Sequence, residues 1–234
     1  MHPCLVANSL AMVLPVGAIG VLAGAVVNQL AWSIPRGDYL WRRGAAARWR
    51  QHSVHRPIVE LTTGLLFVAA AFRFGLSWLL PAYLYFASVA VVLCVIDVKH
   101  RVLPNVIVYP SFVIGVVLLG LAAIGDHQPQ TLARAAGGAL ALFAFFLLSA
   151  VVTPRGVGMG DVKLAAVVGL YLGYLSWRAV VVGALSSFLV TALVGVALML
   201  AGRAHRKSTV PFGPALFAGS VVGIVLSWPG HGIA

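Results

Sequence analysis

Charge is the scarcest property of this 234-residue sequence, because only 9% of its residues are charged and only 5 are acidic. A water-soluble domain carries charge on about a quarter of its residues. Hydrophobic residues make up 61% of the chain and fall into long uninterrupted runs. This composition excludes an ordinary soluble domain and predicts an integral membrane protein.

Cysteine is equally scarce, and its two copies, Cys4 and Cys94, lie far apart within or beside apolar runs. Their spacing indicates neither a disulfide framework nor a metal site. His52 and His55 stand three positions apart, without cysteine or acidic companions at the spacing of zinc ligands. We therefore expect no bound metal.

The apolar runs predict an all-α, polytopic membrane protein with about eight transmembrane helices, in one integral-membrane domain spanning residues 1–234. No basic segment precedes the first run, so its helix is expected to remain as an anchor and not to be cleaved as a signal peptide. The second and sixth helices are short enough to be tilted or partly re-entrant. The expected helices are Leu5–Trp32, Ile58–Phe72, Leu76–Ile96, Val106–Ile124, Leu132–Val152, Val162–Leu175, Ala179–Ala201 and Pro211–Trp228.

The net charge of +11 comes from Lys and Arg residues that cluster in alternate loops. Short cytoplasmic loops collect these residues, so membrane topology explains the charge better than nucleic-acid binding does. The opposite loops hold only Arg73, Arg134 and Arg178. This asymmetry predicts that both chain ends lie on the outer side of the membrane, opposite the cytoplasm, and that the polar stretches around residues 97 and 161 lie at the cytoplasmic face.

In this topology residues 35–57 form a basic cytoplasmic loop, in which Trp41 and Trp49 alternate with arginines. The loop is too short to bury a core of its own. We expect it to rest on anionic lipid headgroups, and a substrate-docking arm is the alternative.

Two polar stretches, each containing Asp-Val-Lys, interrupt the apolar runs at the predicted cytoplasmic face. Asp97 ends the third expected helix, and Asp161 opens the sixth. Ionised groups are costly near hydrocarbon, so an aspartate at such a position is a candidate functional residue. Two carboxylates that approach each other share a proton, so that one can activate water while the other protonates the scissile group. The two aspartates are therefore predicted to form one hydrolytic site that needs no metal.

The residues around the aspartates have two interpretations each. Gly158 and Gly160 lack a Cβ atom and so allow a sharp turn, or the close approach of a substrate strand or a neighbouring helix. Lys99 and Lys163 each follow an aspartate by two positions and either stabilise its ionised form or mark the cytoplasmic boundary. Pro104-Asn105 is typical of a helix start.

Residues 158–164, Gly-Met-Gly-Asp-Val-Lys-Leu, resemble the G-x-G-D-x-K-L signature of the type IV prepilin leader peptidases, which are membrane aspartyl peptidases. Asp97 followed by Leu-Pro-Asn at 103–105 resembles the first catalytic aspartate of that family and its downstream I/L-P-N. Further segments resemble family motifs in the same order. They are Gly24–Asn28 with Ile34-Pro35, Glu60–Gly64 and Val210–Pro214.

The resemblance implies an aspartic endopeptidase of the bacterial cytoplasmic membrane that removes the basic leader from type IV pilin-like precursors. Asp97 and Asp161 would be its catalytic pair. Glu60 is a substrate-binding candidate, although a carboxylate there also suits the start of a helix by about 0.3–1 kcal/mol. Phe212, Gly213 and Pro214 are read first as a helix start and second as a substrate-lining turn.

Many members of the family also methylate the new N-terminus with S-adenosylmethionine and carry two C-x-x-C pairs in the first cytoplasmic loop. Residues 35–57 contain no cysteine, so zinc is not expected, and Ser33 replaces the arginine of the family's R-x-P. The resemblance therefore leaves methyl transfer and its cofactor open, whereas the peptidase motifs are complete.

Two other classes of function compete with the peptidase. Paired intramembrane aspartates also serve in proton- or cation-coupled transporters, but such sites lie near the bilayer midplane and not beside lysines at one face. An inactive assembly protein is the third alternative. Retention of Asp97, Asp161 and the two glycines argues against it.

Overall fold

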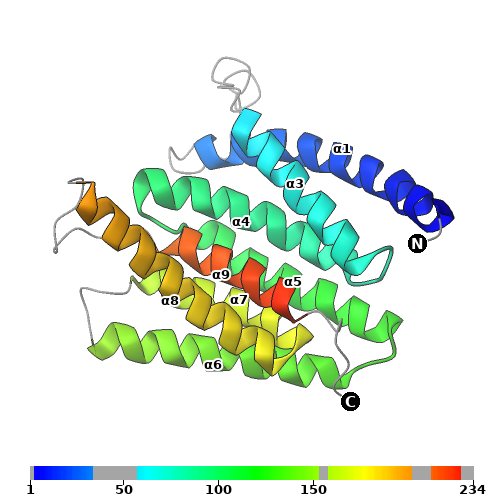
Figure 1. Ribbon diagram of the computed structural model, residues 1–234. Helices are drawn as coiled ribbons and strands as arrows, with labels where there is room; N and C mark the ends of the chain where they lie inside the picture. The colour runs from blue at the N-terminus through cyan, green and yellow to red at the C-terminus, as the bar shows by residue number, and fades with distance from the viewer. Residues whose placement is uncertain (1–2, 34–56, 153–157, 202–211, 228–234) are drawn as a thin grey trace, which may run out of the picture. The chain divides into compact units, whose positions relative to one another are not determined.

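The computed structural model describes residues 3–33, 57–152, 158–201 and 212–227, and these ranges are helical apart from short turns. The fold class is all-α, as predicted. Figure 1 shows the helices, and their bounds are α1 Pro3–Ser33, α3 Pro57–Phe74, α4 Leu80–His100, α5 Asn105–Gly125, α6 Gln130–Val152, α7 Met159–Leu175, α8 Trp177–Leu200 and α9 Gly213–Leu226.

Within the described ranges, five helices are long and apolar enough to cross a membrane, namely α3, α4, α5, α6 and α8. The chain is therefore a multi-pass membrane protein. Helix α7 has 17 residues and α9 has 14, so their spanning, like that of α1, stays a prediction. The basic loop at 35–57 lies outside the described residues, except for Pro57.

Two helix starts differ from the sequence-based expectation by three residues or more. Helix α4 begins at Leu80 and not at Leu76, because residues 75–79 form a turn in which Gly75 has a φ of +58°. Glycine adopts this left-handed conformation without steric cost. Helix α7 begins at Met159, three residues before the expected start, so Asp161 lies inside its first turn.

Residues 1–100 form one compact unit, in which α1, α3 and α4 pack together. Glycines on α1 allow its backbone to touch α3. A Cβ atom at Gly20 would lie 2.8 Å from Phe67, and one at Gly24 would lie 2.7 Å from the Cα of Glu60. Small residues serve the same purpose in membrane helix pairs generally, since close backbone approach maximises van der Waals contact.

Residues 101–234 form the second unit, and α7 is its central helix, packed against α5, α6, α8 and α9. Gly138 on α6 and Gly169 on α7 touch backbone to backbone, so a side chain on either would overlap the other helix. Arg134 on α6 donates from Nε to the carbonyl of Gly173 at 2.8 Å and from its guanidinium to that of Tyr174. A cation thus satisfies the last carbonyls of α7, where the helix dipole favours positive charge.

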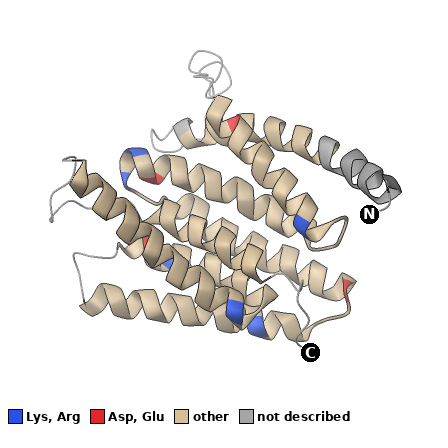
Figure 2. Cartoon of the chain, viewed as in Figure 1, with Lys and Arg blue, Asp and Glu red and all other residues tan. Residues whose placement is uncertain are grey.

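The described charged residues lie near helix ends and leave the helix middles without charge, as Figure 2 shows. This arrangement suits a membrane protein, because an ionised group in the centre of a spanning segment is costly. The same cost restricts where acid-base chemistry can occur in this chain. The candidate residues must therefore be sought at the helix ends.

Candidate active site

Asp161 occupies the third position of α7 and is half-buried. Its carboxylate accepts a hydrogen bond from the backbone N–H of Gly158 at 3.3 Å, while its own N–H donates to the Gly158 carbonyl at 3.0 Å. The positive end of the helix dipole stabilises a carboxylate in this turn. The carboxylate is therefore held toward Gly158 at the very start of the helix.

The two glycines of the Gly-Met-Gly-Asp segment have different surroundings. A Cβ atom at Gly160 would lie 3.0 Å from the Cβ of Leu103, which is tighter than ordinary contact. At Gly158 a Cβ atom would meet the Asp161 carboxylate at 3.3 Å and otherwise open space, and this residue is exposed. Gly160 thus permits packing of a neighbouring segment, whereas Gly158 leaves one side of the aspartate accessible.

Lys163 contacts the start of α5. Its Nζ donates to the side-chain oxygen of Asn105 at 2.9 Å and lies 5.1 Å from the centre of the Tyr109 ring. Asn105 is the first residue of α5, directly after Pro104, whose backbone is extended. The Leu-Pro-Asn and Gly-x-Gly-Asp-x-Lys motifs are therefore packed against each other, although about 55 residues separate them in sequence.

Sequence reasoning did not single out Tyr109. A signal for it was present, because Tyr109 follows Asn105 by four positions, and such residues share one face of a helix. A lysine that reaches Asn105 can therefore also reach the ring, and a cation over an aromatic face is attracted to it.

Asp97 lies in the last turn of α4 and is only 6% exposed. The negative end of a helix dipole disfavours a carboxylate there and favours cations such as Lys99, which lies in the same turn. Helix capping thus accounts for the placement of Asp161 but not for that of Asp97. A buried acid in an electrostatically unfavourable place fits a functional role.

The structure brings Gly158, Gly160, Asp161 and Lys163 together with Pro104 and Asn105 in the second unit. Asp97 and Lys99 belong to the first unit. The two aspartates thus lie in different units, and their pairing stays a prediction.

The substrate-binding candidates lie at helix starts, in agreement with their simpler interpretation. Glu60 is half-buried in the first turn of α3, against Gly24 of α1. Phe212 precedes α9 and packs on Phe146 and Phe188, with ring centres 5.3 and 5.5 Å apart. Gly213 and Pro214 begin α9. Packing and helix initiation account for these positions, and a binding role for them stays a prediction.

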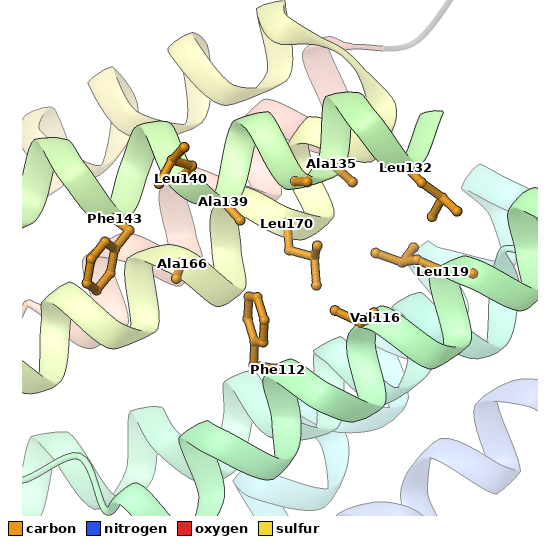
Figure 3. Close-up of a pocket in the computed structure, with 12 residues that line it drawn as sticks. Phe112, Val116, Leu119, Leu132, Ala135, Ala139, Leu140, Phe143, Ala166 and Leu170 are labelled. Carbon is orange, nitrogen blue, oxygen red and sulfur yellow. The ribbon is translucent and has the colours of Figure 1, made fainter. Parts of the chain in front are cut away.

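A cavity of about 630 Å³ lies between α5, α6 and α7, and Figure 3 shows apolar side chains around it. In that view Phe143 lies toward one end and Leu132 toward the other, with Ala166 and Leu170 of α7 between. The lining offers no polar side chain to a nucleoside or a carboxylate, and burying such groups without hydrogen bonds is costly. The cavity therefore does not fit S-adenosylmethionine.

The described ranges contain no group of three or more His, Cys, Asp or Glu side chains arranged to hold a metal ion. His52 and His55, which the sequence analysis considered as ligands, lie outside those ranges. The expectation of a zinc-free enzyme therefore stays a prediction.

Comparison with known proteins assigns the chain to a family. Residues 83–200, which include Asp97 and Asp161, match the sequence profile of the type IV leader peptidase family. The chain is 33% identical over 192 residues to the prepilin leader peptidase/N-methyltransferase of Bacillus subtilis, an alignment that covers 81% of this chain and 73% of that protein.

Similar proteins of the same name occur in two further bacteria. That of Pseudomonas aeruginosa is 35% identical over 188 residues, and that of Stutzerimonas stutzeri is 32% identical over 189 residues. These alignments cover 79% and 80% of this chain but only 63% and 64% of the relatives. No solved structure matches the chain significantly.

The family profile spans half of the chain, and the alignment with the Bacillus protein extends over most of both sequences. Neither comparison supports the transporter alternative. The chain belongs to the type IV leader peptidase family and is a multi-pass membrane peptidase.

Proposed function

We propose that this protein removes the basic leader peptide from type IV pilin-like precursors, with Asp97 and Asp161 as its catalytic pair. The relatives are named prepilin leader peptidases, and the residues that match the family profile, 83–200, include both aspartates. The observation that carries the proposal is the Asp161 carboxylate, which is held at the start of α7 beside an exposed glycine. That arrangement leaves room for an extended substrate backbone next to the acid.

In the proposed reaction, the ionised member of the pair accepts a proton from a water molecule as its oxygen attacks the scissile carbonyl carbon. The protonated member donates to the carbonyl oxygen, and a proton then passes to the leaving amine as the C–N bond breaks. The two aspartates share one proton, so the roles of acid and base are assigned to the pair and not to Asp97 or Asp161 individually. The peptidase step needs no cofactor.

The cytoplasmic face of a bacterial inner membrane is the proposed location of this chemistry. Lys99 and Lys163 follow the two aspartates, and Lys and Arg residues concentrate in cytoplasmic loops. Anionic headgroups are the proposed lipid partners, because they attract the same basic segments. A precursor whose apolar segment lies in the membrane would present its basic leader at this face.

Methyl transfer would be a second step, for which S-adenosylmethionine supplies the methyl group. The relatives' names include an N-methyltransferase activity, but the apolar cavity does not fit that molecule. The proposed reaction is therefore peptide hydrolysis, and methyl transfer stays open.

The test reconstitutes the purified protein in liposomes with a pilin-like precursor, with and without S-adenosylmethionine. Mass spectrometry of the product would report the cleavage point and any mass added to the new N-terminus. We expect cleavage in both conditions. An intact precursor after incubation with correctly folded protein would refute the proposed function.

A further inference from the structure

Lys163 links the first turn of α7 to the first turn of α5. Its amine donates to the Asn105 amide oxygen at 2.9 Å and faces the Tyr109 ring at 5.1 Å, and its side chain is partly buried. An amide oxygen and an aromatic face each attract an ammonium group from a defined direction. The two contacts together fix where the lysine amine lies.

The first turn of α7 is where such a restraint has the largest effect. The first four N–H groups of a helix have no carbonyl partner within it, so this turn is the least constrained. Gly158 and Gly160 add backbone freedom on both sides of Met159. Asp161 lies in this turn and its carboxylate accepts the Gly158 N–H, so the carboxylate moves with the backbone of the turn.

Residues 103–109 contact the start of α7 from outside the helix. The backbone of Gly160 packs on Leu103, and Lys163 reaches Asn105 and Tyr109. These contacts lie on either side of Asp161 in the sequence. The Pro104 ring restricts the backbone that carries Leu103 and Asn105, so the segment against which α7 packs is itself stiff.

We propose that Lys163 is a positioning residue, whose amine, held by Asn105 and Tyr109, fixes the first turn of α7 and thereby the direction of the Asp161 carboxylate. The inference rests on the proposed peptidase function. Residues two positions apart on a helix do not face each other, so the effect on Asp161 travels through the backbone. Misplacing a reacting group by about 1 Å can lower the rate by about 100-fold.

The test is a double-mutant cycle of Lys163→Met and Asn105→Ala, with kcat and KM measured on a pilin-like precursor in liposomes. Each single variant should lower kcat by about 10- to 100-fold and leave KM within about twofold, because the contact aligns the catalytic acid and not the substrate. The double variant should be no slower than the slower single variant, because the two substitutions remove the same contact between Lys163 and Asn105. Arg178→Met, which removes an exposed cation near the other end of α7, should keep full activity.

Two further measurements separate positioning from the alternatives. The acid limb of the pH–rate profile should stay where it is in Lys163→Met. If the lysine instead acted on Asp161 through its charge, removing that charge would shift the acid limb. Asn105→Asp keeps an acceptor for the lysine and should retain most of kcat, whereas Asn105→Ala should not.

Additive losses in the double variant, a shifted acid limb, or loss of kcat that parallels thermal unfolding at the assay temperature would each overturn the inference. If the wild-type protein cleaves the precursor but the losses of kcat in the two single variants add in the double variant, only the positioning role of Lys163 is refuted. Wild-type protein that fails to cleave would refute the proposed function itself.

Discussion

The backbone of Gly160 lies against the side chain of Leu103, so closely that a Cβ atom added to the glycine would sit 3.0 Å from the Cβ of Leu103. Gly160 directly precedes Asp161, and Leu103 belongs to the polar stretch that begins at Asp97. Within the second unit, the Leu-Pro-Asn segment at 103–105 is thus in direct contact with the Gly-x-Gly-Asp segment at 158–161.

Gly160→Ala is therefore expected to destabilise the protein by about 1–3 kcal/mol, as overpacking does, and to lower cleavage. Leu103→Ala in the same chain should recover part of both losses, because it removes the Leu103 Cδ1 and Cγ atoms, which would lie 3.3 and 3.5 Å from the new methyl group, while the Cβ atom at 3.0 Å remains. Thermal unfolding in detergent and initial cleavage rates would measure the two effects. If Gly160→Ala loses as much stability and cleavage with Leu103→Ala as without it, the contact with Leu103 is not the cause of the losses.

Asp97→Asn and Asp161→Asn are each expected to abolish cleavage, because one carboxylate cannot act as proton donor and acceptor together. Asp161→Asn should in addition lose about 0.3–1 kcal/mol of helix-dipole stabilisation, which thermal unfolding in detergent would measure.

Asp126→Asn is the matched control, since Asp126 is exposed at the end of α5. It should cleave at the wild-type rate. A rate near wild type for either of the other two asparagine variants would mean that the catalytic pair has been wrongly assigned.

Chelators are expected to leave the peptidase activity unchanged, because the predicted mechanism uses two carboxylates and the sequence shows no cluster of ligands at metal spacing. Serine- and cysteine-directed reagents should likewise have no effect. Cleavage would be measured after incubation with EDTA and then with added zinc. Loss with the chelator and recovery with zinc would contradict a metal-free mechanism.

The Lys and Arg distribution predicts the orientation of the chain in the membrane. In a background without Cys4 and Cys94, cysteines placed at Ser53 and Ser208 should react with an impermeant thiol reagent only from the cytoplasmic side. A cysteine at Gln128, in the turn between α5 and α6, should react only from outside. External labelling at Ser53 would invert the topology and place the aspartates on the wrong face for a cytoplasmic leader.

Substrate recognition is expected to depend little on the charge of the leader, because the basic cytoplasmic loops repel a basic leader while the aspartates and anionic lipids attract it. The residue before the scissile bond should matter more, since the exposed Gly158 turn allows close approach only by a small residue. Neutralising one or two leader lysines should change kcat/KM modestly, whereas a bulky residue at that position should stop cleavage. The reverse pattern in these two substrate series would disprove this explanation.

The sequence alone determined the fold class and the approximate helices, because backbone polar groups in lipid must be satisfied within the segment and long apolar runs can then only be helical. The sequence also identified Asp161, with Gly158 and Gly160, as part of a candidate site, for a related reason. An acid between two apolar runs is too costly to persist without a role.

Local and tertiary contacts together decided where α7 begins. Gly-Met-Gly has low helix propensity and predicts a turn, yet the helix starts at Met159. There the Asp161 carboxylate accepts the Gly158 N–H, and Gly160 packs on Leu103. A local capping contact and a tertiary packing contact together thus outweigh the low helix propensity of this segment.

Only the tertiary structure identified the partner of Lys163. From the sequence, the lysine could equally mark the cytoplasmic boundary or stabilise a carboxylate, because its position relative to residues distant in the chain is set by helix packing. Glycine contacts align α6 with α7, and α5 packs on the same helix. This packing brings Asn105 to the lysine amine, across 58 positions of sequence that carry no local signal of the contact.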